Sequence, residues 1–122
     1  MRKLNSTNTI NKLNLEDACG MAYTVSRIGG RWKLSILGIL LDYGKLRYND
    51  LQKRLTGISE RMLAKQLKEL EKHGLIVKHT FAEVPPHVEY DLSEKGRSLK
   101  LVLESMSAWG NAQASRSSDT TT

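Results

Sequence analysis

The segment from Ser59 to His73 carries four cationic side chains at intervals of three or four residues: Arg61, Lys65, Lys68 and Lys72. At about 3.6 residues per turn these cations fall on one face of a helix, and the leucines of the segment fall on the opposite face. A row of cations on a helix suits contact with the phosphates of a nucleic acid. The alternative is a solvated face with ion pairs between successive turns, which is the commoner meaning of such a row.

The elements on either side of this segment favour the nucleic-acid interpretation. Ser59 is a suitable N-cap for a helix over residues 60–73, and Gly74 suits the position after its last turn. A shorter helix is predicted over residues 48–55, and only a three-residue turn that contains Gly57 separates the two. Two helices joined by such a turn form a helix-turn-helix, whose second helix enters the major groove of DNA.

After this helix the pattern changes to one that is typical of strands. Residues 75–81 are rich in branched and aromatic side chains, and residues 88–92 alternate between apolar and acidic types. The loop between them holds two consecutive prolines, which cannot donate to a strand ladder. The sequence thus predicts a β-hairpin directly after the recognition helix, the arrangement called a winged helix, with His87 in the wing.

The remaining elements are predicted to be mostly helical. Helices are expected over residues 18–28, 32–42 and 94–112, and a short strand is expected over residues 45–47. The last helix carries an apolar stripe at i, i+3, i+4 and i+7 spacing: Leu99, Val102, Leu103, Met106 and Trp109. Because the stripe is wider than one short wing can cover, it predicts an interface between two copies of the chain.

Composition and charge agree with a small nucleic-acid-binding domain. The chain has 122 residues, a formal net charge of +6 and a sequence pI of about 9.6. Residues 27–78 hold 12 Lys and Arg against 5 Asp and Glu, so the positive charge is concentrated around the two helices. We expect a flexible arm over residues 1–17, one domain over 18–114 and a disordered tail over 115–122.

Several other classes of protein are disfavoured. The sequence has no glycine-rich nucleotide loop and no set of residues at metal-ligand spacing, so we expect no enzyme activity, no cofactor and no metal. One cysteine excludes an internal disulfide. No apolar run follows the basic start or is long enough to span a membrane, so the expected location is the cytoplasm.

Three motifs in the same order resemble the HxlR family, a group of winged-helix regulators related to the MarR regulators. Residues 29–33 (GGRWK) are similar to the family's GG[KR]W signature, and residues 57–63 (GISERML) are similar to its G-I-S-x-[RK]-[MV]-L segment. Residues 84–90 (VPPHVEY) resemble its V-P-P-[RK]-V-E-Y wing. The resemblance covers residues 19–110. Two departures are Gly20, where the family commonly has proline, and His87, where it usually has a fixed cation.

The resemblance implies a homodimer joined through its first and last helices, with a recognition helix and a wing on each subunit. The combined prediction is an α+β fold: a winged helix-turn-helix, mostly helical with a small antiparallel wing. Its expected function is sequence-specific regulation of transcription at a double-stranded DNA operator. The expected DNA contacts are Ser59, Arg61, Lys65, Lys68, Lys72 and His87. The alternative is a winged-helix module that binds only another protein, and such modules usually lose the basic row that this chain keeps. The operator and the effector stay open.

Cys19 has two interpretations. It lies at the start of the first predicted helix, where the helix dipole favours a negatively charged sulfur, and some members of the resembling family sense oxidants through a cysteine at this place. Glu16 and Asp17 beside it oppose that charge, and packing as a small apolar residue is the ordinary role of a free cysteine. A redox sensor is therefore one hypothesis and a packing residue is the other.

Overall fold

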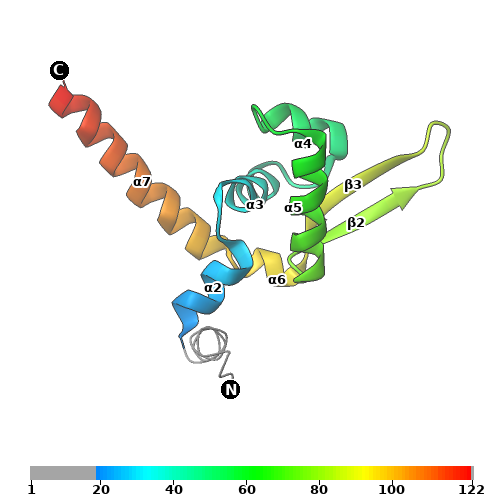
Figure 1. Ribbon diagram of the computed structural model, residues 1–122, viewed down its shortest axis with the longest axis horizontal. Coiled ribbons are helices and arrows are strands. Elements are labelled where there is room, and N and C mark those ends of the chain that lie inside the picture. The colour runs from blue at the N-terminus through cyan, green and yellow to red at the C-terminus, as the bar shows by residue number, and fades with distance from the viewer. Residues whose placement is uncertain (1–18, 122) are drawn as a thin grey trace, which may run out of the picture.

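The computed structural model describes residues 19–121, with side chains through residue 115. Its elements are α2 (Gly20–Ile28), α3 (Arg31–Tyr43), β1 (Leu46–Arg47), α4 (Tyr48–Arg54), α5 (Glu60–Lys72), β2 (Ile76–Phe81), β3 (His87–Leu92), α6 (Glu94–Arg97) and α7 (Lys100–Thr121). The β2–β3 hairpin projects from one side of the helices and α7 projects from the other (Figure 1). The predicted α+β winged fold is confirmed. The predicted arm over residues 1–17 lies outside the described residues.

Helix α3 forms the centre of the core. It buries Ile36, Leu37 and Leu40, and α5 packs against it through its own buried leucines, Leu63, Leu67 and Leu70. Full burial of one such side chain contributes about 1.5–3 kcal/mol. Because the core holds the apolar face of α5, the opposite face of α5 is left toward solvent.

The hairpin belongs to a three-stranded antiparallel sheet in the order β1-β3-β2. Phe81 pairs with His87 next to the hairpin loop, and Ile76 pairs with Leu92 at its base. On the other side of β3, Leu46 of β1 pairs with Tyr90. The short strand β1 thus ties the start of the helix-turn-helix to the wing.

The single helix expected over residues 94–112 is wrong, because the structure has two helices there. The Ser93 hydroxyl accepts a hydrogen bond from the Gly96 amide at 2.9 Å and starts α6. Gly96 is buried against the start of β2, and a Cβ at this position would lie 2.1 Å from the Leu75 carbonyl oxygen. The chain turns after Arg97, and α7 leaves in a new direction (Figure 1).

Helix α7 extends through Thr121 and so includes backbone that was expected to be a disordered tail. No glycine or proline follows Gly110 to end the helix. None of the described helices is long and apolar enough to cross a lipid bilayer.

Candidate nucleic-acid interface

The turn before α5 sets the position and direction of this helix. Gly57 has a φ of +87°, a conformation that side-chain-bearing residues rarely adopt. The Ser59 hydroxyl accepts a hydrogen bond from the Met62 amide at 3.0 Å, so Ser59 is the N-cap that the sequence predicts. Such a cap contributes about 1 kcal/mol to stability. Ser59, Glu60 and Arg61 are exposed at this end of α5.

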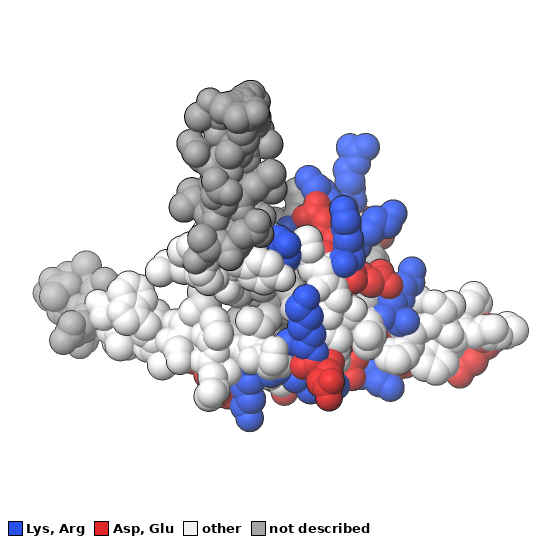
Figure 2. All heavy atoms as spheres, turned by 90° about the horizontal axis from the view of Figure 1, so that it is seen from below, with Lys and Arg blue, Asp and Glu red and all other residues white. Residues whose placement is uncertain are grey.

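The exposed face of α5 carries the four cations that the helical periodicity places there. Arg61, Lys65, Lys68 and Lys72 are all exposed. Figure 2 shows Lys and Arg side chains gathered over the part of the molecule where α5 and its neighbours lie. The projecting part of α7, from residue 105 to residue 115, contains no charged residue. The projecting part of α7 therefore adds nothing to the positive charge, which is concentrated in residues 27–78.

None of these four cations forms an ion pair with another residue in the part of the chain that the structure describes. Glu69, one of the acidic residues on the flanks of α5, instead contacts a lysine of α3. The alternative of a face neutralised by ion pairs between turns thus finds no support in the described contacts. The cations remain available to an anionic partner.

The contact between Lys33 of α3 and Glu69 of α5 was missed by the sequence analysis. The Lys33 ammonium donates to the Glu69 carboxylate at 2.5 Å, and its side chain is only 14% exposed. This hydrogen bond lowers the pKa of Glu69, against the opposing effect of burial. The pair joins two helices that are 36 residues apart in sequence, so periodicity along one helix carries no signal for it. Its effect is to hold the recognition helix against the central helix.

His87, the DNA contact predicted in the wing, lies between two carboxylates. Its Nε2 lies 3.0 Å from a Glu89 carboxylate oxygen, and its Nδ1 lies 3.4 Å from Glu83. Its ring also stacks on Phe81 with 4.6 Å between the centroids. With a side chain that is only 14% exposed and both nitrogens near carboxylates, His87 is placed to hold the hairpin together.

A basic residue beside the wing was also missed. Arg47 of β1 is exposed, and it lines a groove of about 400 Å³ between the start of α4 and the hairpin loop. Pro85 and Pro86 form the other wall of this groove. Only the pairing of β1 with β3 brings Arg47 to the wing, where its backbone lies opposite that of Glu89.

The apolar stripe of the last helix divides into two parts. Leu103 is 7% exposed and belongs to the core of its own chain, and Leu99 packs against that core. Val102, Met106 and Trp109 are exposed to solvent. Leu103, which the sequence assigned to a subunit interface, is thus buried within its own chain. Among the exposed apolar side chains outside the stripe are Leu101 of α7 and Met21 and Val25 of α2.

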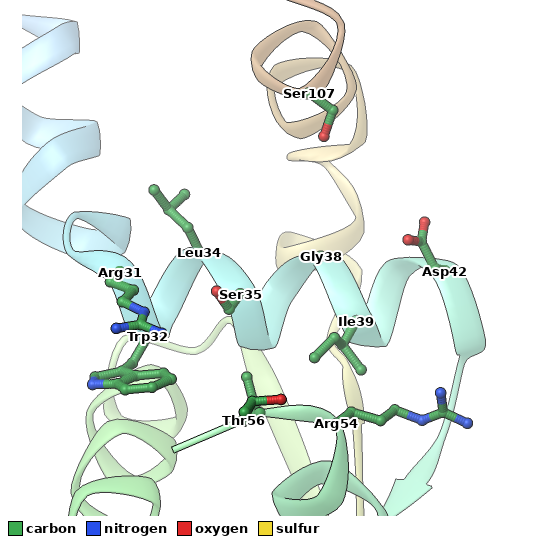
Figure 3. Close-up of a pocket in the computed structure, with 11 residues that line it drawn as sticks. Arg31, Trp32, Leu34, Ser35, Gly38, Ile39, Asp42, Arg54, Thr56 and Ser107 are labelled. Carbon is green, nitrogen blue, oxygen red and sulfur yellow. The ribbon is translucent and has the colours of Figure 1, made fainter. Parts of the chain in front are cut away.

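A groove of about 500 Å³ runs along α3, with the turn after α4 on one side and α7 on the other (Figure 3). Arg31 lies at one end, where its guanidinium stacks over the Trp32 ring at 4.3 Å. Arg54 extends along the opposite wall and stacks over Tyr43 at 3.8 Å. Trp32 packs against the core, so its ring is held by the protein itself.

Cys19 occupies the N-cap position of α2, one residue before the helix begins. Its side chain makes no capping hydrogen bond, and the thiol is free and half-buried. The neighbouring helix surface carries the exposed Met21. Cys19 thus lies beside α2, one of the two helices that carry exposed apolar side chains.

A helix-turn-helix with a capped, basic second helix and a β-hairpin directly after it defines a winged helix-turn-helix domain of the transcription-regulator type. The HxlR-like helix-turn-helix family matches residues 27–118, and the chain belongs to this family. It is similar to an HTH-type transcriptional regulator of Methanothermobacter thermautotrophicus, with 43% identity over 100 residues that cover 82% of this chain and 76% of the relative. That relative is a transcriptional regulator.

Two similar solved structures belong to redox-related states of regulators. The oxidised form of the redox regulator HypR has a TM-score of 0.73 and 38% identity, and the match covers 77% of this chain and 96% of that chain. Diamide-treated YodB from B. subtilis has a TM-score of 0.64 and 35% identity, with 77% and 93% of the two chains covered.

Proposed function

We propose that this transcriptional regulator binds operator DNA as a homodimer, with α5 of each subunit in the major groove. The observation that carries the proposal is the exposed row of four cations on α5, none of them ion-paired with a described residue. The Ser59 hydroxyl, at the start of α5, lies at the end of a recognition helix that usually reaches base edges. Arg47, in the groove beside the wing, supplies a cation near the hairpin loop, where the family usually has one at the position of His87.

The dimer places two recognition helices on one DNA duplex. The exposed apolar side chains of α7 and α2 form the surface that a second copy would cover, because exposed apolar patches mark association sites. A two-fold dimer reads an inverted repeat whose half-sites lie about 10 base pairs apart, or a multiple of that spacing. The interface and the DNA contacts then serve one purpose, which is to fix the distance between the two α5 helices.

The first test separates base contacts from phosphate contacts. Arg61→Ala and Lys65→Ala remove cations from the first half of α5, and a residue that reads a base should lose about 1–3 kcal/mol of specific binding. Loss of a phosphate contact should instead weaken specific and non-specific binding equally. The measurement is a gel shift with the DNA upstream of the protein's own gene, in competition with a scrambled duplex.

Lys100→Ala is the matched control, because it removes one exposed lysine outside the helix-turn-helix. We expect it to bind like the wild type. Unchanged binding by both α5 variants would contradict the proposed orientation of this helix. A wild-type protein that binds no duplex at all would favour the alternative of a module that binds only protein.

We also propose that oxidation of Cys19 changes operator affinity. Two observations support this: the thiol lies at the start of α2 beside exposed apolar side chains, and similar structures include oxidised HypR and diamide-treated YodB. With one cysteine in the chain, the oxidised product is a disulfide between subunits, a mixed disulfide or a sulfenic acid. Each of these would alter the surface that α2 presents to a second copy.

Treatment with diamide should change the operator affinity of the wild type and leave Cys19→Ser unchanged. Operator affinity is measured by fluorescence anisotropy before and after treatment, and the modification is identified by intact mass. Addition of dithiothreitol should restore the original affinity, because disulfides are reversible. If the wild type and Cys19→Ser respond alike, Cys19 is a packing residue and the sensor hypothesis is wrong.

A further inference from the structure

A small cavity lies where α2, the end of α5 and the α6–α7 turn meet. Its volume is about 90 Å³, and its inner wall is formed by three apolar residues: Ile28, Leu75 and Leu99. Polar and cationic side chains also line it, among them Thr24, His73 and Lys95. An apolar interior with a few converging polar groups is the usual construction of a small-molecule site.

The charges around this cavity favour an anion. Burial lowers the pKa of His73, and the nearby cations Arg27, Lys72 and Lys33 lower it further, against the opposing effect of Glu69. Lys95 lies on the α6 side of the same cavity, and its ammonium donates to the His73 carbonyl oxygen at 3.2 Å. A negative group placed here would be attracted by the cations Arg27 of α2, Lys72 of α5 and Lys95 of α6, whereas Lys33 is already paired with Glu69.

The size of the cavity limits the rest of the ligand. An apolar protein cavity of roughly 150 Å³ accepts benzene, and this one is smaller, at about 90 Å³. A branched chain of three or four carbons is the largest apolar body that suits it. We propose that this cavity binds a short-chain carboxylate, with its hydrocarbon part against Leu75 and Leu99 and its carboxylate at Lys95 and His73.

The position of the cavity connects it to DNA binding. His73 is the C-cap of α5, and Lys95 stabilises this end of the helix through the carbonyl contact. When the Lys95 ammonium donates to a bound carboxylate, its hydrogen bond to the His73 carbonyl oxygen weakens, and the end of the recognition helix loses this contact. This regulatory part of the proposal rests on the proposed function, whereas the binding part does not.

The binding test uses the wild-type protein without DNA. Isobutyrate is titrated and the His73 ring and Thr24 amide are followed by NMR, with isobutyramide as the uncharged compound of the same shape. We expect saturable shifts, and about tenfold weaker binding of isobutyramide because the charge-assisted hydrogen bond is lost. Bound isobutyrate should also raise the pKa of His73, so affinity should increase as the pH falls toward that pKa.

Five variants make the test specific. Lys95→Gln should reduce the preference for isobutyrate over isobutyramide, and Lys95→Arg should retain it. Lys100→Gln, the same change at an exposed lysine outside the cavity, should behave like the wild type. Thr24→Leu should fill the cavity and abolish binding, whereas Ser35→Leu, in the larger groove of Figure 3, should leave it unchanged. Thermal unfolding establishes that each variant is folded.

Equal affinity for the two compounds, or unchanged binding by Thr24→Leu, would overturn the site. The regulatory part is tested by operator affinity at saturating isobutyrate, with chloride replaced so that ionic strength is constant. We expect a change of several-fold that isobutyramide does not produce and that Thr24→Leu removes. Binding of isobutyrate with unchanged operator affinity would overturn the regulatory part alone, and a protein that binds no DNA would leave the NMR result intact.

Discussion

Raising the salt concentration from 50 to 200 mM should weaken binding to duplex DNA by roughly 10³- to 10⁵-fold. Each subunit exposes four cations on α5 and another, Arg47, beside the wing. A dimer with these side chains can neutralise about 6–10 phosphates, and each contact releases condensed counterions from the DNA. The loss is large because every released ion contributes separately to the dependence on salt.

Fluorescence anisotropy with a labelled duplex at a series of salt concentrations measures how the logarithm of the affinity depends on the logarithm of the salt concentration. Lys65→Ala removes one cation from each subunit, so the slope of log affinity against log salt should decrease by about two in a dimer. Lys100→Ala, the control outside the helix-turn-helix, should leave the slope unchanged. An affinity that is constant across this range of salt would contradict binding through the α5 cations.

Replacement of Val102 and Met106 by aspartate should yield a folded monomer that binds operator about 10²- to 10⁴-fold more weakly. Both side chains are exposed on α7, so charges are tolerated by the isolated subunit and are unfavourable at an apolar interface. The loss of operator binding follows because a monomer engages only one half-site and forfeits the gain from bivalent attachment. Light scattering gives the oligomeric state, and circular dichroism establishes the fold.

Leu103→Ala is the matched comparison on the same helix. Because Leu103 is buried in its own subunit, at 7% exposure, this change should reduce the free energy of unfolding by about 2–5 kcal/mol. The dimer should persist below the lowered melting temperature. A wild-type protein that is monomeric at micromolar concentration, or a Val102/Met106 double variant that remains dimeric, would rule out this interface.

Leu103 and Met106 also show what the sequence pattern cannot predict. Helical spacing groups Leu103 and Met106 in one apolar stripe, but the spacing does not tell which neighbour each side chain meets. One part of the stripe packs on the core and the other faces solvent, because α7 starts in a new direction after the α6 turn. That turn depends on the close approach of Gly96 to the Leu75 backbone, a contact between segments that are distant in sequence.

The sequence alone determined the features that depend on neighbouring residues. The cationic face of α5, its Ser59 cap and the wing after it follow from helical period, capping chemistry and strand alternation, which act over a few residues. The tertiary structure decided which side chains meet across elements. It joined Lys33 to Glu69, placed His87 between two carboxylates, and brought Arg47 to the wing. These contacts depend on how the elements pack in space, and no local pattern of residue types specifies that packing.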